Sequence, residues 1–287
     1  MAASKESSTY EFVEELAGGT NLNFIIRERA TSAVWACKIF KNSKSFAKDH
    51  ADLNDRAVLA HRLAMKTGTC VPEVRLIDAS QVAFSPAFDT FLTRYAEDTI
   101  MQRKLLLEEF GGLALENFLK IAKLSKIRNL EQVLHNLVFN VWIGNYDSKE
   151  HDYVVNNDLI CHSIDYSLTG PGFVDDYSLS IGAYFQTYDF DNVTDTGWAI
   201  ADVLLDEIKH KRYTVDFFHP LISVIEGLDA DTIKDAFKGL NFYRFGTTAR
   251  INAAYIEFLL ARKEKLRSAV NAWCEAHYPK GKRIPGI

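Results

Sequence analysis

The first third of the chain alternates short apolar runs with polar turns, which predicts a small sheet interrupted by one helix. Residues 50–67 repeat apolar positions at helical spacing, and Gly68 follows where a helix commonly ends. The other runs are short and bounded by turn residues, which is typical of strands. These runs are 10–16, 25–29, 32–40, 70–78 and 89–95, and 81–84 is a further short candidate strand outside this count. The first 95 residues therefore predict the order β-β-β-α-β-β.

From residue 100 onward the apolar spacing is mostly helical. The widest apolar stripe runs from 129 to 143 and leads directly into an acidic loop. Two short apolar runs at 153–155 and 159–161 are separated by the polar residues 156–158, which predicts a hairpin. The predicted helices are 101–109, 113–123, 129–143, 198–210, 215–226, 230–238 and 248–276.

Length and composition agree with a globular protein of one large domain or two lobes. The chain has 287 residues, 47% hydrophobic residues and a net charge of -5. This charge gives no general attraction to nucleic acid, so we expect no direct nucleic-acid binding. No apolar run approaches the length of a membrane span, and the polar N-terminus does not resemble a signal peptide. Four scattered cysteines without zinc-site spacing suggest reduced thiols and a cytoplasmic location.

Three carboxylates frame the predicted hairpin. Asp147 and Asp152 precede it in a loop, and Asp165 follows its second strand. Kinases use one carboxylate to orient and deprotonate the acceptor hydroxyl, a group five residues later to hold metal, and an acid after a hairpin to hold metal between the phosphates. Each acid taken alone is explained equally well by turn chemistry, because Asp is common in loops. All three together at this spacing favour a phosphoryl-transfer site.

The first turn and the third strand carry candidate phosphate-binding groups. Gly18 and Gly19 permit a close backbone approach to phosphate, although an ordinary hairpin turn explains two glycines as well. Lys38 lies among apolar residues in the third strand and therefore needs a partner or a ligand. The alternatives are an edge strand with the Lys38 ammonium in water, or Lys41 in its place.

Several segments resemble HipA-like and phosphatidylinositol 3-/4-kinase-related kinases. VFNVWIGNYDSKEHDYVV followed by IDYSL is similar to their catalytic segment, in which a helix ending in GN precedes a D-R-H-x-x-N loop, a strand and an I-D motif. LAHRLAMKTGTCVPEVRLID resembles their N-lobe helix and strand, and IEFLLARKEKLRSAV resembles their closing helix. The resemblance implies an α+β, bilobal, protein-kinase-like fold. Its small β-rich N-lobe would span residues 1–97, and its larger, mostly helical C-lobe residues 98–287.

The resemblance also implies roles for individual residues. Asp147 matches the catalytic Asp, and Asp152 and Asp165 match the metal-binding positions, which would hold Mg²⁺ or Mn²⁺. The predicted nucleotide-binding residues, which comprise the phosphate-covering turn, the phosphate-anchoring lysine and the adenine-holding linker, are Gly18, Gly19, Thr20, Asn21, Lys38, Arg94, Tyr95, Ala96 and Glu97.

The chain departs from the family pattern at several positions. Ser148 and Lys149 replace an Arg-His pair, and Asp152 replaces an Asn. Ala57 occupies the helix position where an acid would pair with Lys38, so Asp55 or Asp52 would have to substitute. His151 and His162 border the site, and a kinase mechanism requires neither as its base.

The expected function is that of an ATP- and divalent-metal-dependent kinase that phosphorylates a hydroxyl. The resemblance favours a protein Ser/Thr acceptor, with autophosphorylation and a regulatory partner protein as further expectations. A lipid or small-molecule acceptor is the first alternative. A nucleotide-binding pseudokinase that acts as an interaction module is the second, because the paired helix acid is missing.

Overall fold

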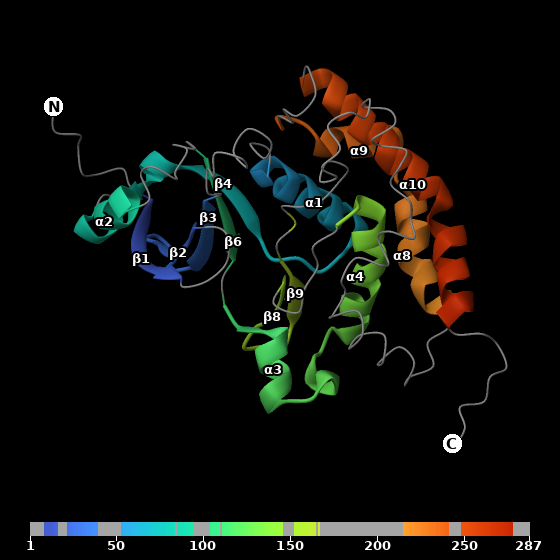
Figure 1. The fold of residues 1–287 in the computed structure, drawn as a ribbon, viewed down its shortest axis with the longest axis horizontal. Coiled ribbons are helices and arrows are strands. Elements are labelled where there is room, and N and C mark those ends of the chain that lie inside the picture. Colours follow the sequence, from blue (N-terminus) through green and yellow to red (C-terminus); the bar gives the residue numbers. More distant parts are fainter. Residues whose placement is uncertain are drawn as a thin grey trace.

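The computed structural model describes a sheet-rich part and a helical part with a small hairpin sheet beneath them (Figure 1). The described residues are 9–16, 22–39, 53–83, 85–94, 104–109, 111–145, 152–164, 166, 215–240 and 248–277. The curled sheet precedes most of the helices in the chain, and strands and helices are segregated rather than alternating. This arrangement confirms the predicted α+β, bilobal fold class.

The larger sheet has six strands in the order β4-β6-β3-β2-β1-β5. Neighbouring strands are antiparallel except for β1 and β5, which are parallel. Its strands are β1 (Tyr10–Leu16), β2 (Leu22–Glu28), β3 (Val34–Ile39), β4 (Val74–Asp78), β5 (Val82–Ala83) and β6 (Lys104–Glu109). Strand β3 lies inside the sheet, between β2 and β6, so side chains on it have neighbours on both sides.

Helix α2 (Pro86–Arg94) covers one face of this sheet and closes a small aromatic core. Phe88 and Phe91 stand one helical turn apart, and both rings pack against Phe12 and Phe24 at centroid distances of 5.1–5.7 Å. The Ser85 hydroxyl caps the helix by accepting the Phe88 N–H at 3.1 Å. Residues 89–95 were expected within the strand order. The i, i+3 spacing of the two phenylalanines and the serine cap instead place residues 89–94 in a helix.

The smaller sheet has the order β7-β8-β9, with antiparallel pairing throughout. Its strands are β7 (Leu113–Ala114), β8 (Tyr153–Val155) and β9 (Cys161–Ser163). The predicted hairpin is present, but its second strand begins at Cys161 rather than at Leu159. Leu159 has φ 61° and donates its N–H to Asn156 O at 3.0 Å, so it belongs to the turn.

The helical part surrounds α4, which is buried along nearly its whole length. Its apolar side chains join those of α8, α9 and α10 in one core. The remaining elements are α1 (Leu53–Thr67), the 3₁₀ turns η1 (Ala79–Gln81) and η2 (Leu124–Lys126), α3 (Leu115–Ile121), α4 (Leu130–Ile143), α8 (Val215–Gly227), α9 (Ala230–Ala236) and α10 (Thr248–His277). The helices predicted over 129–143, 215–226, 230–238 and 248–276 are present, and 198–210 lies outside the described residues.

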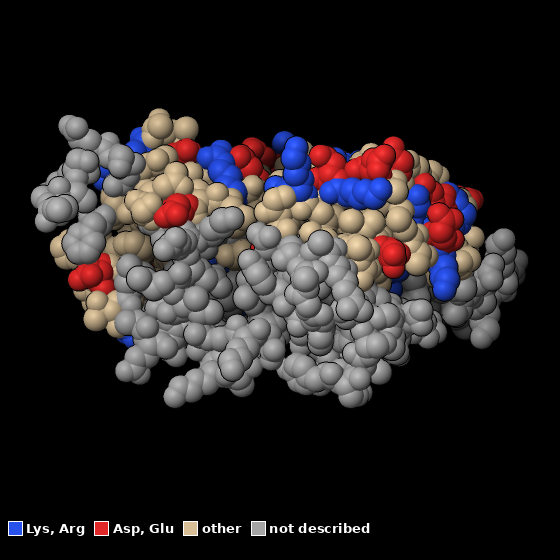
Figure 2. Space-filling view, turned by 90° about the horizontal axis from the view of Figure 1, so that it is seen from above, with Lys and Arg blue, Asp and Glu red and all other residues tan. Residues whose placement is uncertain are grey.

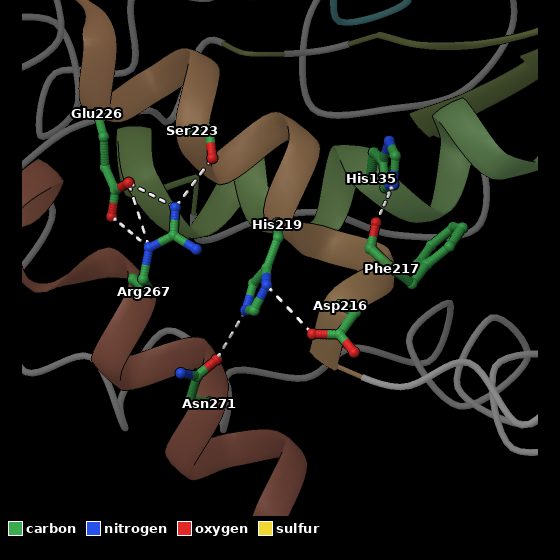
Figure 3. Close-up of polar contacts among 8 residues, drawn as sticks. All are labelled: His135, Asp216, Phe217, His219, Ser223, Glu226, Arg267 and Asn271. Atoms are coloured by element: carbon green, nitrogen blue, oxygen red, sulfur yellow. Dashed lines mark hydrogen bonds and ion pairs between the residues drawn. The ribbon is translucent and has the colours of Figure 1, made fainter.

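Polar contacts fix α8 between α4 and α10 (Figure 3). His135 of α4 contacts Phe217 O at 2.7 Å, and Arg267 of α10 makes a forked ion pair with Glu226, with its shortest N–O distance at 2.6 Å. His219 contacts Asn271 Oδ1 at 3.4 Å. These contacts hold the frame on which α4 is presented to the hairpin.

Helix α1 belongs to the helical core, although it lies between two strands of the six-stranded sheet in sequence. Its buried side chains, including Ala57 and Leu63, join the cluster formed with α4, α8 and α10. Arg62 also donates to the carbonyls of Ala236 and Lys238 at the end of α9, each at 2.8 Å. Helix α1 therefore ties the two parts together rather than covering the sheet alone (Figure 1).

The sheet-rich part extends further along the chain than predicted. Residues 101–109 were expected to be helical, but residues 104–109 form β6, which pairs with both β3 and β4. A short, continuous apolar run such as LLL fits a buried strand and a helix equally well by periodicity, and the two partner strands decide it here. The expected boundary at residue 97 falls before β6, which still belongs to the six-stranded sheet.

The described helices and the charged side chains on the surface bear on where the molecule can lie and what it can bind. None of the helices described combines the length and the apolar composition needed to cross a bilayer. On the face shown in Figure 2, the visible Lys and Arg side chains are interspersed with Asp and Glu side chains. Ion pairs of this kind include Lys66–Asp235 and Lys234–Asp231, at 3.1 and 3.0 Å.

Candidate active site between the sheet and the hairpin

Helix α4 delivers the chain to the predicted catalytic loop. Gly144 ends the helix in the left-handed conformation with φ 68°, and its N–H bonds to the carbonyls of Asn140 and Val141. The Asn145 N–H then bonds to Asn140 O at 2.9 Å. Arg262 of α10 donates to the carbonyls of Val141 and Trp142 from a buried position. The end of α4 is therefore fixed where the chain enters the loop.

Most predicted site residues lie outside the described residues. These are Gly18, Gly19, Thr20, Asn21, Tyr95, Ala96, Glu97, Asp147 and Asp165. Lys38, Arg94 and Asp152 are described. Lys38 and Asp152 are buried, whereas the Arg94 side chain is exposed.

Lys38 is buried in an interior strand. Its side chain is 8% exposed, and its backbone pairs with Asn23 of β2 and Leu106 of β6. The edge-strand alternative is excluded, because β3 has a neighbour on each side. A buried ammonium in the middle of a sheet is costly unless it is held by a partner or a ligand. The rival Lys41 lies outside the described residues.

Asp152 is buried at the start of the hairpin. Its residue exposure is 6%, and its carbonyl accepts the Ile164 N–H at 2.7 Å. Ile164 immediately precedes Asp165 in the chain. A backbone hydrogen bond therefore links Asp152, one predicted metal ligand, to Ile164, the residue before the other predicted ligand, Asp165.

Arg94 does not lie in the linker between the sheet and the helical part. It ends α2, and its side chain is 57% exposed and paired with Glu15 of β1 at 2.7 Å. The chain instead passes from the six-stranded sheet to the smaller sheet between Glu109 of β6 and Leu113 of β7, through a linker that includes Gly111 and Gly112. Arg94 therefore ends a helix, and the chain leaves the six-stranded sheet only after β6, which comes later in the sequence.

The true linker approaches the hairpin closely at Gly112. Its φ is 139°, and a Cβ built there would collide with Val155 O and lie 2.7 Å from Val155 C. Such a backbone contact is open to glycine alone. The preceding Gly111 has no atom within 4 Å of a built Cβ, so the two glycines of the pair serve different purposes.

A cavity of about 200 Å³ lies between this linker and the hairpin. Val154 of β8, Ile164 after β9, and Gly111 of the linker contribute to its wall. The other lining residues are Pro72, Asn156, Asn157, Asp158 and His162. The hairpin that follows Asp152 therefore presents both apolar and polar groups to this cavity beside the linker.

His162 reaches from this cavity toward Cys70. The His162 Nδ1 to Cys70 Sγ distance is 3.5 Å, and Asn129 Nδ2 lies 3.3 Å from the same sulfur. Burial raises the pKa of the Cys70 thiol, which keeps it protonated at neutral pH. Asn129 also pairs with the N–H and the carbonyl of Cys161, each at 2.8 Å, which anchors the start of β9. His162 is therefore a structural residue with one edge on the cavity.

Sequence reasoning missed two buried Asn–Tyr pairs behind the hairpin. Asn136 and Asn140 lie one turn apart on α4 and are 2% and 0% exposed. Asn136 contacts the Tyr166 hydroxyl through both its amide atoms at 3.2 Å, and Asn140 donates to the Tyr153 hydroxyl at 3.3 Å. Polar residues inside an apolar stripe were the signal that could have drawn attention to them.

The Tyr166 hydroxyl is neutral at physiological pH. Burial, reinforced by the nearby Tyr153 hydroxyl, raises the pKa of Tyr166 far above its ordinary value. This hydroxyl therefore serves as a hydrogen-bonding group toward Asn136 and carries no charge.

The described residues supply one of the predicted metal ligands. Asp152 offers the carboxylate oxygens that Mg²⁺ and Mn²⁺ prefer. Among the described residues there is no cluster of three His, Cys, Asp or Glu side chains that would form a complete metal site. The side-chain amide oxygen of Asn145 is buried and has no hydrogen-bond partner among the described residues, and Asn145 precedes Asp147 by two positions in the sequence.

The arrangement of sheet and helices is that of a bilobal, kinase-like α+β fold. The crystal structure of the Helicobacter pylori proinflammatory kinase CtkA is similar at a TM-score of 0.51 and 10% sequence identity. The match covers 92% of this chain and 95% of that chain. No protein-family model matches the sequence, and no curated protein matches it. The likeness extends over the whole fold and is one of architecture.

Proposed function

We propose that this chain is a kinase that uses ATP and a divalent metal ion to phosphorylate a hydroxyl group. The observation that carries the proposal is the burial of two charged groups, Lys38 in the interior of the sheet and Asp152 at the start of the hairpin. Both stand at positions where a kinase fold requires phosphate- and metal-binding groups. The likeness of the fold to CtkA supports the same conclusion.

Each residue in the proposed site has a distinct task. Lys38 neutralises phosphate charge, and the turn from Gly18 to Asn21 covers the phosphates with its backbone N–H groups. Asp147 accepts the proton of the acceptor hydroxyl as that oxygen bonds to the γ-phosphorus, and ADP leaves with the electron pair of the broken P–O bond. Asp152 and Asp165 hold the metal ion, which supplies neutralisation of phosphate charge when bound.

The base of the nucleotide is assigned to the cavity beside the linker. Val154 and Ile164 give an apolar wall, and the backbone near Gly111 offers hydrogen-bonding groups at its edge. We therefore propose that the linker after β6 holds the base, in place of Arg94–Glu97, because the chain leaves the six-stranded sheet after β6.

A pseudokinase remains a second candidate because of one specific observation. Ala57, at the position where an acid would pair with Lys38, is 2% exposed and packs into the helical core. An acid at position 57 would be buried among apolar side chains, so the active-state ion pair has no counterpart at this position. Asp55 is half-buried in the first turn of α1, and Asp52 lies outside the described residues.

The two functions are separated by a phosphorylation assay on the full chain. Wild-type protein is incubated with γ-labelled ATP and Mg²⁺ or Mn²⁺, beside Asp147→Asn and Lys38→Met. The mass of the intact protein is then measured, together with nucleotide binding by calorimetry. Lys66→Met is the matched control, since Lys66 pairs with Asp235 on the outside of the helical part.

A kinase gives phosphoryl incorporation or ATP consumption in the wild type and in Lys66→Met. We expect Asp147→Asn to lose transfer while it still binds nucleotide, and Lys38→Met to lose both. Turnover that survives in Asp147→Asn would refute the assignment of that residue. Nucleotide binding without any turnover would support the pseudokinase.

The acceptor is proposed to be a Ser or Thr hydroxyl of a protein, and the chain itself is one candidate. Incorporation into the intact chain would identify autophosphorylation. ATP consumption that rises only when lipids or small alcohols are added would move the acceptor to a small molecule.

A further inference from the structure

Helix α4 carries two asparagines where the rest of its buried surface is apolar. Asn136 and Asn140 are four residues apart and therefore lie on one face of the helix. Asn is a poor helix former, and a buried amide costs free energy unless it is fully hydrogen-bonded. The neighbouring side chains on α4, such as Leu137 and Phe139, are buried and apolar, so packing of the helix does not by itself require an amide at these two positions.

Each asparagine holds a tyrosine that directly follows a predicted metal ligand. Asn140 binds the hydroxyl of Tyr153, which follows Asp152, and Asn136 binds the hydroxyl of Tyr166, which follows Asp165. Both tyrosines are almost completely buried, at 0% and 3% exposure. The ring of Tyr166 also packs edge-on against Phe139 of α4, at a centroid distance of 6.0 Å.

The same polar ladder extends to the predicted catalytic loop. Asn145 Nδ2 lies 3.5 Å from Asn140 Oδ1, and the Asn145 backbone bonds to Asn140 O. Asn145 precedes Asp147 by two residues. One helix face thus reaches the chain next to each of the three predicted acids.

A tyrosine anchored in this way fixes the backbone of the residue before it. Rotation of the chain at Asp152 or Asp165 would pull a phenol out of a closed pocket and leave an amide unpaired. Hydrogen-bonding partners behind metal ligands usually set the orientation of those ligands, and their loss commonly lowers metal affinity about 10- to 100-fold.

We propose that Asn136 and Asn140 are positioning residues, which use the Tyr166 and Tyr153 hydroxyls to hold the two metal-binding aspartates in a common frame. The inference rests on the proposed function in one respect, the assignment of Asp152 and Asp165 as metal ligands. It adds that the geometry of the metal site is set from α4, and that the hairpin alone does not fix it.

The test compares paired apolar replacements with a control on the same helix. In the double variants N136L/Y166F and N140L/Y153F, both polar groups of a pair are removed together, and N140L/Y153F also withdraws the Asn140 Oδ1 that lies 3.5 Å from Asn145 Nδ2. His135→Leu is the matched control, because His135 also loses one hydrogen bond but points to Phe217 of α8 (Figure 3). Asp152→Asn marks the loss of a ligand itself.

Mn²⁺ binding to the full chain is measured by electron paramagnetic resonance, without nucleotide and with ATP, and folding is measured by urea denaturation. We expect both double variants to unfold close to the wild-type urea concentration while their Mn²⁺ Kd rises about 10-fold or more. His135→Leu should keep the wild-type Kd.

The outcomes separate this inference from the proposed function. A wild-type Mn²⁺ Kd in both double variants, with binding lost in Asp152→Asn, would overturn the positioning role and leave the kinase assignment intact. An equal loss of affinity in His135→Leu would also overturn it, since the effect would then be general to α4. Absence of Mn²⁺ binding in the wild type, with and without ATP, would overturn both.

Discussion

Gly112 should be the most sensitive position in the linker between the sheet and the helical part. Replacing it by alanine puts a Cβ at a φ of 139°, in collision with Val155 O and 2.9 Å from Asn156 Cα. The obstructing atoms are backbone atoms of the hairpin, so they cannot rotate away as a flexible side chain could. The linker or the hairpin has to move.

The cost of Gly112→Ala has two parts. The backbone conformation costs a non-glycine residue about 1 to 3 kcal/mol. Separation of β7 from β8 would weaken the pairing of Leu113 with Val155 and of Ala114 with Val154, at a net cost of about 1 kcal/mol per hydrogen bond. Together they predict a loss of about 3 to 5 kcal/mol in the free energy of unfolding.

The assay is urea denaturation followed by circular dichroism, with Gly111→Ala as the matched control. Gly111 adjoins Gly112 and has open space around its built Cβ, so its replacement should change the unfolding midpoint little. Both variants lose one glycine from the unfolded chain, so that contribution cancels in the comparison. If Gly112→Ala and Gly111→Ala unfold at the same urea concentration, the contact between the linker and the hairpin does not have the importance assigned to it.

Two further predictions concern the frame around α4. Arg262→Met should lower the free energy of unfolding by about 2 to 3 kcal/mol, because the carbonyls at the end of α4 lose a buried guanidinium. Thermal unfolding measures this loss beside that of Arg267→Met, which removes a partly exposed guanidinium. Equal losses in the two variants would contradict the prediction. Glu226→Gln should cost at most about 1 kcal/mol, because the pair with Arg267 is partly exposed. The Arg267 hydrogen bond holds the pKa of Glu226 below its ordinary value, so its stabilisation is complete above the ordinary carboxyl pKa of about 4.3 and disappears as the pH falls through the lowered value. Urea midpoints of wild type and Glu226→Gln should therefore differ at neutral pH and converge at acid pH, and a gap that persists in acid would refute the electrostatic explanation.

The fold class could be read from the sequence because its strongest patterns are local. The apolar stripe of α4, its glycine end at Gly144 and the polar turn at Asn156 are signals within a few residues of one another. The buried Lys38 was also visible, since a lysine flanked by apolar residues in a strand is unusual. These features depend on neighbours along the chain.

The errors arise where distant parts of the chain decide the structure. The run at 104–109 becomes a strand because β3 and β4 lie on its two sides, and this misread strand moved the predicted linker to Arg94. The role of Asn136 and Asn140 depends on tyrosines that are 13 to 30 residues away in sequence. The periodic pattern shows that a residue in the apolar stripe is polar, but it does not identify the distant side chain that forms a hydrogen bond with it.

The attachment of α1 to the helical core has a consequence for the modularity of the molecule. A fragment that ended after β6 would expose the apolar side of α1, including Leu59, Leu63 and Ala64, which are almost completely buried in the whole chain. A fragment that began at the linker would lack the helix that fills the same core against α4 and α8. Neither half is therefore expected to fold independently, and one half cannot be exchanged for that of another protein without disrupting this core. Exchange of segments with another protein of this architecture would have to carry α1 together with the helices that receive it.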